Sequence, residues 1–123
     1  MKYLCLVYLD ESRLDELPDA DCVAYDREIR ESGQCLASEA LQSVHTATTV
    51  RIRNGKLGIT DGPFAETKEQ LAGFYMIEAR DLNEAIRVAS GIPPARVGSI
   101  EIRPIRPIRE TVAAAAAAQA LQD

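Results

Sequence analysis

One nine-residue segment concentrates side chains that could move a proton or hold a polar ligand. Asp61–Glu69 reads Asp-Gly-Pro-Phe-Ala-Glu-Thr-Lys-Glu, with four charged side chains, one hydroxyl and one aromatic ring. The stretches on either side of it are predicted to be strands. Charged loops between strands often carry catalytic and binding residues. The segment is therefore the first candidate for a functional site.

Three side chains in and near this segment are candidate catalytic residues for proton transfer: Asp61, Glu66 and His45, the only histidine. A turn at Gly62-Pro63 would aim Asp61 into a cleft, where burial raises the pKa of a carboxyl group and makes it a proton acceptor. The alternative is a structural role, because an aspartate before glycine and proline stabilises a turn. His45 is either a partner of Asp61 or a packing residue at the start of a strand.

Four further side chains are candidate ligand contacts. Phe64 either anchors the loop on the sheet or forms the wall of a ligand pocket. Thr67 and Lys68 either lie at the surface or bind a polar ligand beside Glu66. Arg51, in the preceding strand, offers a guanidinium group that could hold an anion.

The overall composition is that of one mildly acidic globular domain. The chain has 123 residues, a net charge of −5 and 46% hydrophobic residues. An acidic domain with few aromatic residues is not typical of nucleic-acid binders. No apolar run approaches the roughly 20 residues of a membrane helix, and the short apolar run at the start is interpreted as a first strand rather than a signal peptide. We therefore expect a cytoplasmic protein without nucleic-acid or membrane partners.

The cysteine and histidine content bears on metal binding. A single histidine excludes a multi-histidine metal site. The three cysteines are an odd number and lack the spacing of zinc ligands or of a disulfide framework: Cys5, Cys22 and Cys35. We expect no metal and no cofactor.

The elements that must position the candidate residues follow from hydrophobic periodicity. Helical spacing predicts helices over Asp19–Ser32 and after Asp81, which is a good N-cap. Asn54-Gly55 predicts a tight hairpin turn, which places Asp61 nearly opposite Thr48. The predicted strands lie near residues 3–9, 35–41, 46–53, 56–60, 71–79 and 100–103.

The predicted order, β-α-β-β-β-β-α-β, defines an α+β fold. It contains the split β-α-β pattern of ferredoxin-like folds with an added hairpin. Helices then cover only one face of the sheet, and the apolar residues of the other face need a cover. We expect a homodimer whose two sheets close on each other as a dimeric α+β barrel. Residues 1–109 would form this domain, and residues 110–123 an Ala-rich C-terminal tail, as a frayed or docked helix.

Several strings in this chain resemble the DGPF (DGPFAETKE) proteins of the YCII-related family. In chain order these strings are Thr46–Arg51, Asp61–Glu69, Gly73–Tyr75 and Glu101–Pro104. The resemblance covers nearly everything from residue 3 to residue 104. It implies a dimeric α+β barrel, bacterial origin, and genes that lie beside sigma factors of the extracytoplasmic-function type.

The resemblance also bears on the candidate catalytic residues. In the wider family, a histidine of the first helix and an aspartate meet in a cleft, which suggests enzyme activity. In this chain Asp61 matches the motif. The first predicted helix contains no histidine, so His45 is the substitute that the sequence offers.

Two functions from different classes follow, with a third, simpler alternative. The first is a cofactor-free small-molecule enzyme or ligand binder, with its site at the DGPF loop of the dimeric barrel. The second is a non-enzymatic interaction module that binds a sigma factor, through the arginines of Ile102–Arg109 and the acidic N-terminal half. The third is a structural dimer in which the loop only orders the rim of the barrel.

Overall fold

The computed structural model describes residues 1–122 and contains a four-stranded sheet, a separate two-stranded hairpin and three α-helices. The elements, in chain order, are β1 (Lys2–Leu9), η1 (Glu11–Glu16), α1 (Asp19–Glu31), β2 (Cys35–Ala40), η2 (Val44–Thr46), β3 (Thr48–Arg53), β4 (Lys56–Asp61), β5 (Gln70–Glu78), α2 (Leu82–Ser90), η3 (Pro93–Arg96), β6 (Ser99–Pro104) and α3 (Ile108–Gln122), where η marks a 3-10 helix. The predicted order of strands and helices is confirmed. The 3-10 helix η1 occupies part of the connection after β1.

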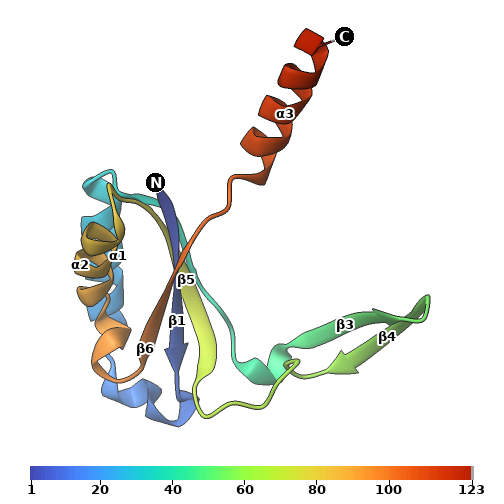
Figure 1. The fold of residues 1–123 in the computed structure, drawn as a ribbon. Coiled ribbons are helices and arrows are strands. Elements are labelled where there is room, and N and C mark those ends of the chain that lie inside the picture. Colours follow the sequence, from blue (N-terminus) through green and yellow to red (C-terminus); the bar gives the residue numbers. More distant parts are fainter. Residues whose placement is uncertain (123) are drawn as a thin grey trace.

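The four-stranded sheet is antiparallel throughout, with the order β2-β5-β1-β6. The first strand lies in the centre, and α1 and α2 both cover the same face (Figure 1). This is the split β-α-β arrangement of ferredoxin-like folds. The mixed α+β fold predicted from the sequence is therefore confirmed.

The core lies between the sheet and the two covering helices. Alternate residues of β1, including Tyr3, Cys5 and Val7, point towards α1 and α2 and are buried, as the two-residue period of a strand requires. They pack with Ile77 of β5 and with alanines of α2. The N-cap of α2 forms as predicted, because the Asp81 carboxylate accepts a hydrogen bond of 2.9 Å from the Glu84 backbone N–H.

The opposite face of the sheet carries apolar side chains that no helix covers. We call this set the open face, and it comprises Leu4, Leu6, Tyr8, Phe74 and Met76. All five residues are partly buried. In the β1–β5 register, Leu4 faces Met76 and Leu6 faces Phe74, so the apolar residues form one continuous surface.

The β3–β4 hairpin projects from the sheet on the side opposite α1 and α2 (Figure 1). Its turn forms as predicted at Asn54-Gly55, where both residues have positive φ, 52° and 73°. The predicted register is also confirmed, because Asp61 is the partner of Thr48. The strand β3 begins two residues later than predicted, since η2 occupies the positions before Ala47.

The C-terminal tail forms the helix α3, which leaves the sheet at the other end (Figure 1). Every residue of α3 is exposed. The six consecutive alanines favour helix through their intrinsic propensity rather than through packing on this chain. Asp123 lies outside the described residues.

Candidate functional site

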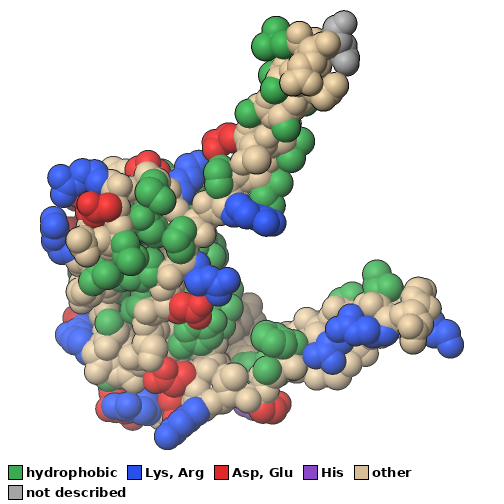
Figure 2. Space-filling view, in the orientation of Figure 1, with side chains coloured by type: hydrophobic (Ala, Val, Ile, Leu, Met, Phe, Trp, Pro, Cys, Tyr) green, Lys and Arg blue, Asp and Glu red, His purple; other side chains and the backbone are tan. Residues whose placement is uncertain are grey.

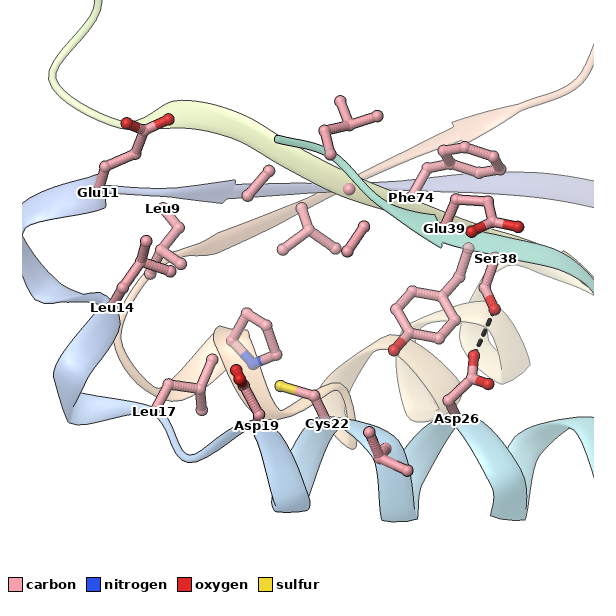
Figure 3. Close-up of a pocket in the computed structure, with 18 of the residues that line it drawn as sticks. Leu9, Glu11, Leu14, Leu17, Asp19, Cys22, Asp26, Ser38, Glu39 and Phe74 are labelled. Carbon is pink, nitrogen blue, oxygen red and sulfur yellow. Dashed lines mark hydrogen bonds between the residues drawn. The ribbon is translucent and has the colours of Figure 1, made fainter. Parts of the chain in front are cut away.

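A cavity of about 520 Å³ lies between α1 and the face of the sheet that the helices cover (Figure 3). Its lining comes from β1, η1, α1, β2, β5 and the start of η3. Leu9, Leu17 and Cys22 lie on the inner side of the sheet, whereas Glu39 and Phe74 lie on the far side of the strands (Figure 3). The cavity is large enough for a small organic molecule.

Most of the cavity wall is apolar. Leucines of β1 and η1 and a proline of η3 contribute, together with the Cys22 thiol. Burial raises the pKa of Cys22, and the neighbouring Asp19 and Asp21 carboxylates raise it further. The thiol is therefore protonated at neutral pH, which makes it part of an apolar wall rather than an activated nucleophile.

One end of the cavity is polar and is built by Asp26, Arg30 and Ser38. The Ser38 hydroxyl donates a short hydrogen bond to the Asp26 carboxylate (Figure 3). Arg30 donates to the Ser38 hydroxyl at 2.7 Å and to the Ser38 carbonyl oxygen at 2.9 Å. Its Nε also pairs with Asp26 at 2.9 Å. A carboxylate and a guanidinium group thus lie side by side at the end of an apolar pocket.

The local fold explains why these three residues meet. Asp26 and Arg30 are four residues apart on α1, and such residues are neighbours on one helix face. Ser38 belongs to β2 and is only 6% exposed, because it points towards α1. The cluster therefore also ties the first helix to the edge strand.

Tyr75 extends the polar end of the cavity. Its ring meets that of Tyr25 edge to face, with centroids 5.7 Å apart. Burial is the main cause that raises the pKa of each phenol to about 12. Both are therefore hydrogen-bond donors at neutral pH, and Tyr25 uses its O–H to donate to the Val88 carbonyl at 2.8 Å.

Glu11 connects the cavity to the segment that the sequence singled out. Its carboxylate accepts hydrogen bonds from the Ser43 hydroxyl at 2.9 Å and from the Val44 N–H at 2.6 Å. Its own N–H donates to the Gln70 side chain at 3.1 Å. Glu11 and Ser43 both line the cavity, so the 3-10 turn that carries His45 and the end of the Asp61–Glu69 segment lie beside this part of its lining.

The predicted catalytic residues lie outside this cavity in the described chain. Asp61 is the last residue of β4, His45 sits in η2, and Glu66 lies in the connection to β5; all three side chains are exposed. The expected bend occurs at Gly62, whose φ is +99°. Phe64 does not anchor the loop, because its side chain is 79% exposed. Their proposed role stays a prediction.

The other predicted ligand contacts help to shape the segment itself. Thr67 donates to the Glu69 carbonyl at 2.6 Å, and Arg51 donates to the Phe64 carbonyl at 3.3 Å. Lys68 is exposed. These bonds stabilise the loop, so part of its polar sequence has a structural explanation.

Sequence reasoning missed the Asp26, Arg30 and Ser38 cluster. Asp26 and Arg30 gave a weak signal as an ion-pair spacing on a helix, but surface helices carry many such pairs. Ser38 gave none, because only the fold brings β2 against α1. Among residues 1–122, no group of three metal-ligating side chains is found. In that part of the chain, no helix has the length and apolar character to cross a membrane.

The fold and the cavity define an α+β protein with a pocket between the first helix and the sheet. A family model described as the YCII-related domain matches residues 1–109. The chain belongs to the YCII-related family. An uncharacterised protein of Rhizobium meliloti (strain 1021) is 39% identical over 114 residues, which covers 85% of this chain and 92% of the relative.

A solved structure shares the fold at low sequence identity. It is a 5-chloro-2-hydroxyhydroquinone dehydrochlorinase from Burkholderia phenoliruptrix AC1100, in complex with 2,5-dihydroxybenzoquinone. The TM-score is 0.52 at 12% identity, and the match covers 86% of this chain and 94% of the other. At this identity the likeness concerns the fold alone.

Proposed function

We propose that this protein binds a small, largely apolar cyclic molecule with hydroxyl or carbonyl groups in the cavity between α1 and the sheet. The observation that carries the proposal is the cavity itself, whose wall is mostly apolar, with the Asp26, Arg30 and Ser38 cluster at one end and a few further polar side chains, including Glu11 and Ser43, elsewhere in its lining. Sites for small molecules commonly combine apolar walls with a few placed polar groups. The Asp26 carboxylate can accept a hydrogen bond from a ligand hydroxyl, and the Arg30 guanidinium can donate to a carbonyl oxygen.

The solved relative in fold supports this ligand class. The dehydrochlorinase is recorded with 2,5-dihydroxybenzoquinone, a six-membered ring that carries two hydroxyl and two carbonyl groups. A ring of that size fits within a cavity of about 520 Å³, and one edge of it could contact the Asp26, Arg30 and Ser38 cluster. For a cofactor-free reaction, Asp26 would be a proton acceptor close to the ligand.

We further propose that the DGPF segment acts at the mouth of this cavity. Glu11 and Ser43 join the cavity lining to η2 and to the end of the segment, which supports this placement. Asp61, with His45 or Glu66, would then exchange protons with a ligand that enters from the mouth. In this proposal the protein is a bacterial cytoplasmic member of the DGPF branch, and its three free cysteines suit a reducing compartment.

Calorimetric titration with 2,5-dihydroxybenzoquinone and with catechol tests the proposal. The variant Cys22→Phe should abolish binding, because the larger side chain enters the cavity from α1. The matched control Cys22→Ala keeps the cavity open and should bind like the wild type. If neither probe binds the wild type, or if Cys22→Phe binds as well as Cys22→Ala, the cavity is not the site.

We also propose the homodimer expected from the sequence. The open face supports it, since a continuous apolar surface of this kind marks an interaction site. A second copy of the same sheet would cover it, as in a dimeric α+β barrel. Sedimentation at several concentrations tests this proposal, and a monomer at every concentration would overturn it.

A second candidate function is the non-enzymatic interaction module with a sigma factor. The observation that favours it is the exposed basic segment after β6, where the side chains of Arg106 and Arg109 face solvent. Co-purification with a sigma factor encoded nearby would test it, with Arg106→Ala and Arg109→Ala as variants. No co-purification at low salt would count against this function.

A further inference from the structure

The β3–β4 hairpin has one apolar face and one polar face. In its register, Val50 is the partner of Ile59 and Ile52 is the partner of Leu57. Cross-strand partners point to the same side of a hairpin, so these four side chains form one apolar surface. We call this surface the arm face. The opposite side carries threonines and the charged side chains of Arg51, Arg53 and Lys56.

The arm face has no cover within its own chain. Its four side chains are between 59% and 66% exposed. A surface strand pair normally turns its apolar face to a core, and a two-stranded hairpin by itself is only marginally stable in water. Four exposed apolar side chains on one face therefore indicate that a binding partner covers this face.

The position of the hairpin indicates which partner covers it. The hairpin projects from the sheet on the side of the open face (Figure 1). In the space-filling view, the hairpin and α3 frame an open space beside the body of the molecule (Figure 2). A molecule that enters this space to cover the open face also comes within reach of the hairpin. A second copy of this chain carries both an open face and an arm face. Across a two-fold axis, the hairpin of each copy would pack on the body of the other copy.

The distribution of charge favours the same partner. Residues 48–61 contain three cations (Arg51, Arg53, Lys56) and one anion (Asp61), a net charge of +2. The whole chain has a net charge of −5, so the remainder carries −5 − (+2) = −7. A basic hairpin therefore meets an acidic body when two copies associate, which favours encounter and orientation.

We infer that the β3–β4 hairpin is a dimerisation arm whose arm face packs on the body of a second copy of this chain. This inference rests on the homodimer proposed above and adds a surface to it.

Sedimentation equilibrium of matched variants tests the arm. Ile52→Asp and Ile59→Asp place a carboxylate on the arm face, and Thr60→Asp places the same group on the polar side of the same hairpin. All three positions are exposed in the single chain, so each variant should fold, which circular dichroism checks. The expected result is a dimer that Ile52→Asp and Ile59→Asp each weaken at least tenfold in Kd, while Thr60→Asp changes Kd less than threefold.

Photo-crosslinking gives a second readout. Benzoylphenylalanine at position 52 should give a covalent dimer, and the same group at position 51, on the other side of the strand, should not. The wild type could be a dimer that Ile52→Asp and Ile59→Asp weaken no more than Thr60→Asp does. That result would contradict the role of the hairpin as a dimerisation arm, but not the dimer formed by the two sheets. A wild type that is monomeric at all concentrations would overturn both.

Discussion

The Asp26 carboxylate holds the polar end of the cavity together, because it accepts from both Ser38 and Arg30. Replacing it with asparagine removes the charge and leaves the guanidinium group without its anion. We expect Asp26→Asn to lower the free energy of unfolding by about 1–2 kcal/mol, as for a hydrogen bond to a charged group. Urea unfolding measures this loss.

The control for this variant lies on the same helix. Asp21 pairs with Arg96 at 3.3 Å, and both side chains are exposed. Exposed ion pairs contribute at most about 1 kcal/mol. Asp21→Asn should therefore cost less than Asp26→Asn. An equal or larger loss for Asp21→Asn would contradict the role assigned to the Asp26 cluster.

The raised pKa values of Tyr25 and Tyr75 predict how the free energy of unfolding changes at alkaline pH. Burial raises the pKa of each to about 12, above the value of about 10 in an unfolded chain. The folded state then keeps protons that the unfolded state loses. The contribution of the two phenols to the free energy of unfolding is therefore fully present below pH 10 and is lost as the pH rises towards 12. Cys5, whose pKa burial raises to about 11, acts in the same direction from a lower pH.

The variant Tyr75→Phe isolates one of these groups and keeps the ring contact. It should make the fall in unfolding free energy between pH 10 and pH 12 shallower than in the wild type. Denaturant unfolding at a series of pH values measures the slope. An unchanged slope would mean that the Tyr75 phenol is not protected from ionisation in the fold.

At the scale of elements, the entry into β6 depends on a glycine. A Cβ atom at Gly98 would lie 2.1 Å from the Tyr8 carbonyl oxygen and 3.2 Å from the Leu9 Cα. These are backbone atoms of the central strand and cannot turn away. Gly98→Ala should therefore reduce the free energy of unfolding by about 3 kcal/mol or more. Thermal or urea unfolding measures it.

Gly58 provides the matched control in the hairpin. A Cβ atom there would meet only the Arg51 carbonyl oxygen, at an ordinary 3.7 Å. Gly58→Ala should change the free energy of unfolding by less than about 0.5 kcal/mol. Similar losses for both variants would show that the close approach at Gly98 is relieved by movement of the strand.

The elements with local signals were predictable from sequence. Asn54-Gly55 fixes its turn through residues that tolerate positive φ, and Asp81 caps α2 through a bond to a residue three positions on. The Asp26–Ser38 contact spans 12 residues and exists only because β2 packs against α1. No pattern within either segment records that packing, so sequence placed the candidate site at the charged loop rather than at the cavity.

At the scale of the whole molecule, α3 lies outside the packed body. All its residues are exposed, and it buries no apolar surface on the sheet that its loss would return to water. Removing residues 108–123 should change the Tm by less than about 2 °C. Scanning calorimetry measures this at a protein concentration low enough for monomers. A drop of 5 °C or more would show that the tail stabilises the domain.

The molecule has a cavity on the helix side of the sheet and exposed apolar surfaces on the other side. The cavity is the ligand site proposed above, and the apolar surfaces form the dimer interface proposed above. They lie largely on opposite sides of the same sheet, and Phe74 belongs to both. Ligand binding and dimerisation can therefore be measured separately.

The proposal that the cavity binds a small hydroxylated ring is tested most directly by a ¹H–¹⁵N NMR titration with 2,5-dihydroxybenzoquinone. Binding in the cavity predicts the largest shift changes at backbone amides of residues that line it: Cys22, Asp26, Ser38 and Ala40. It predicts smaller changes at Asp61–Glu69. Changes confined to Asp61–Glu69, or no changes at all, would contradict it.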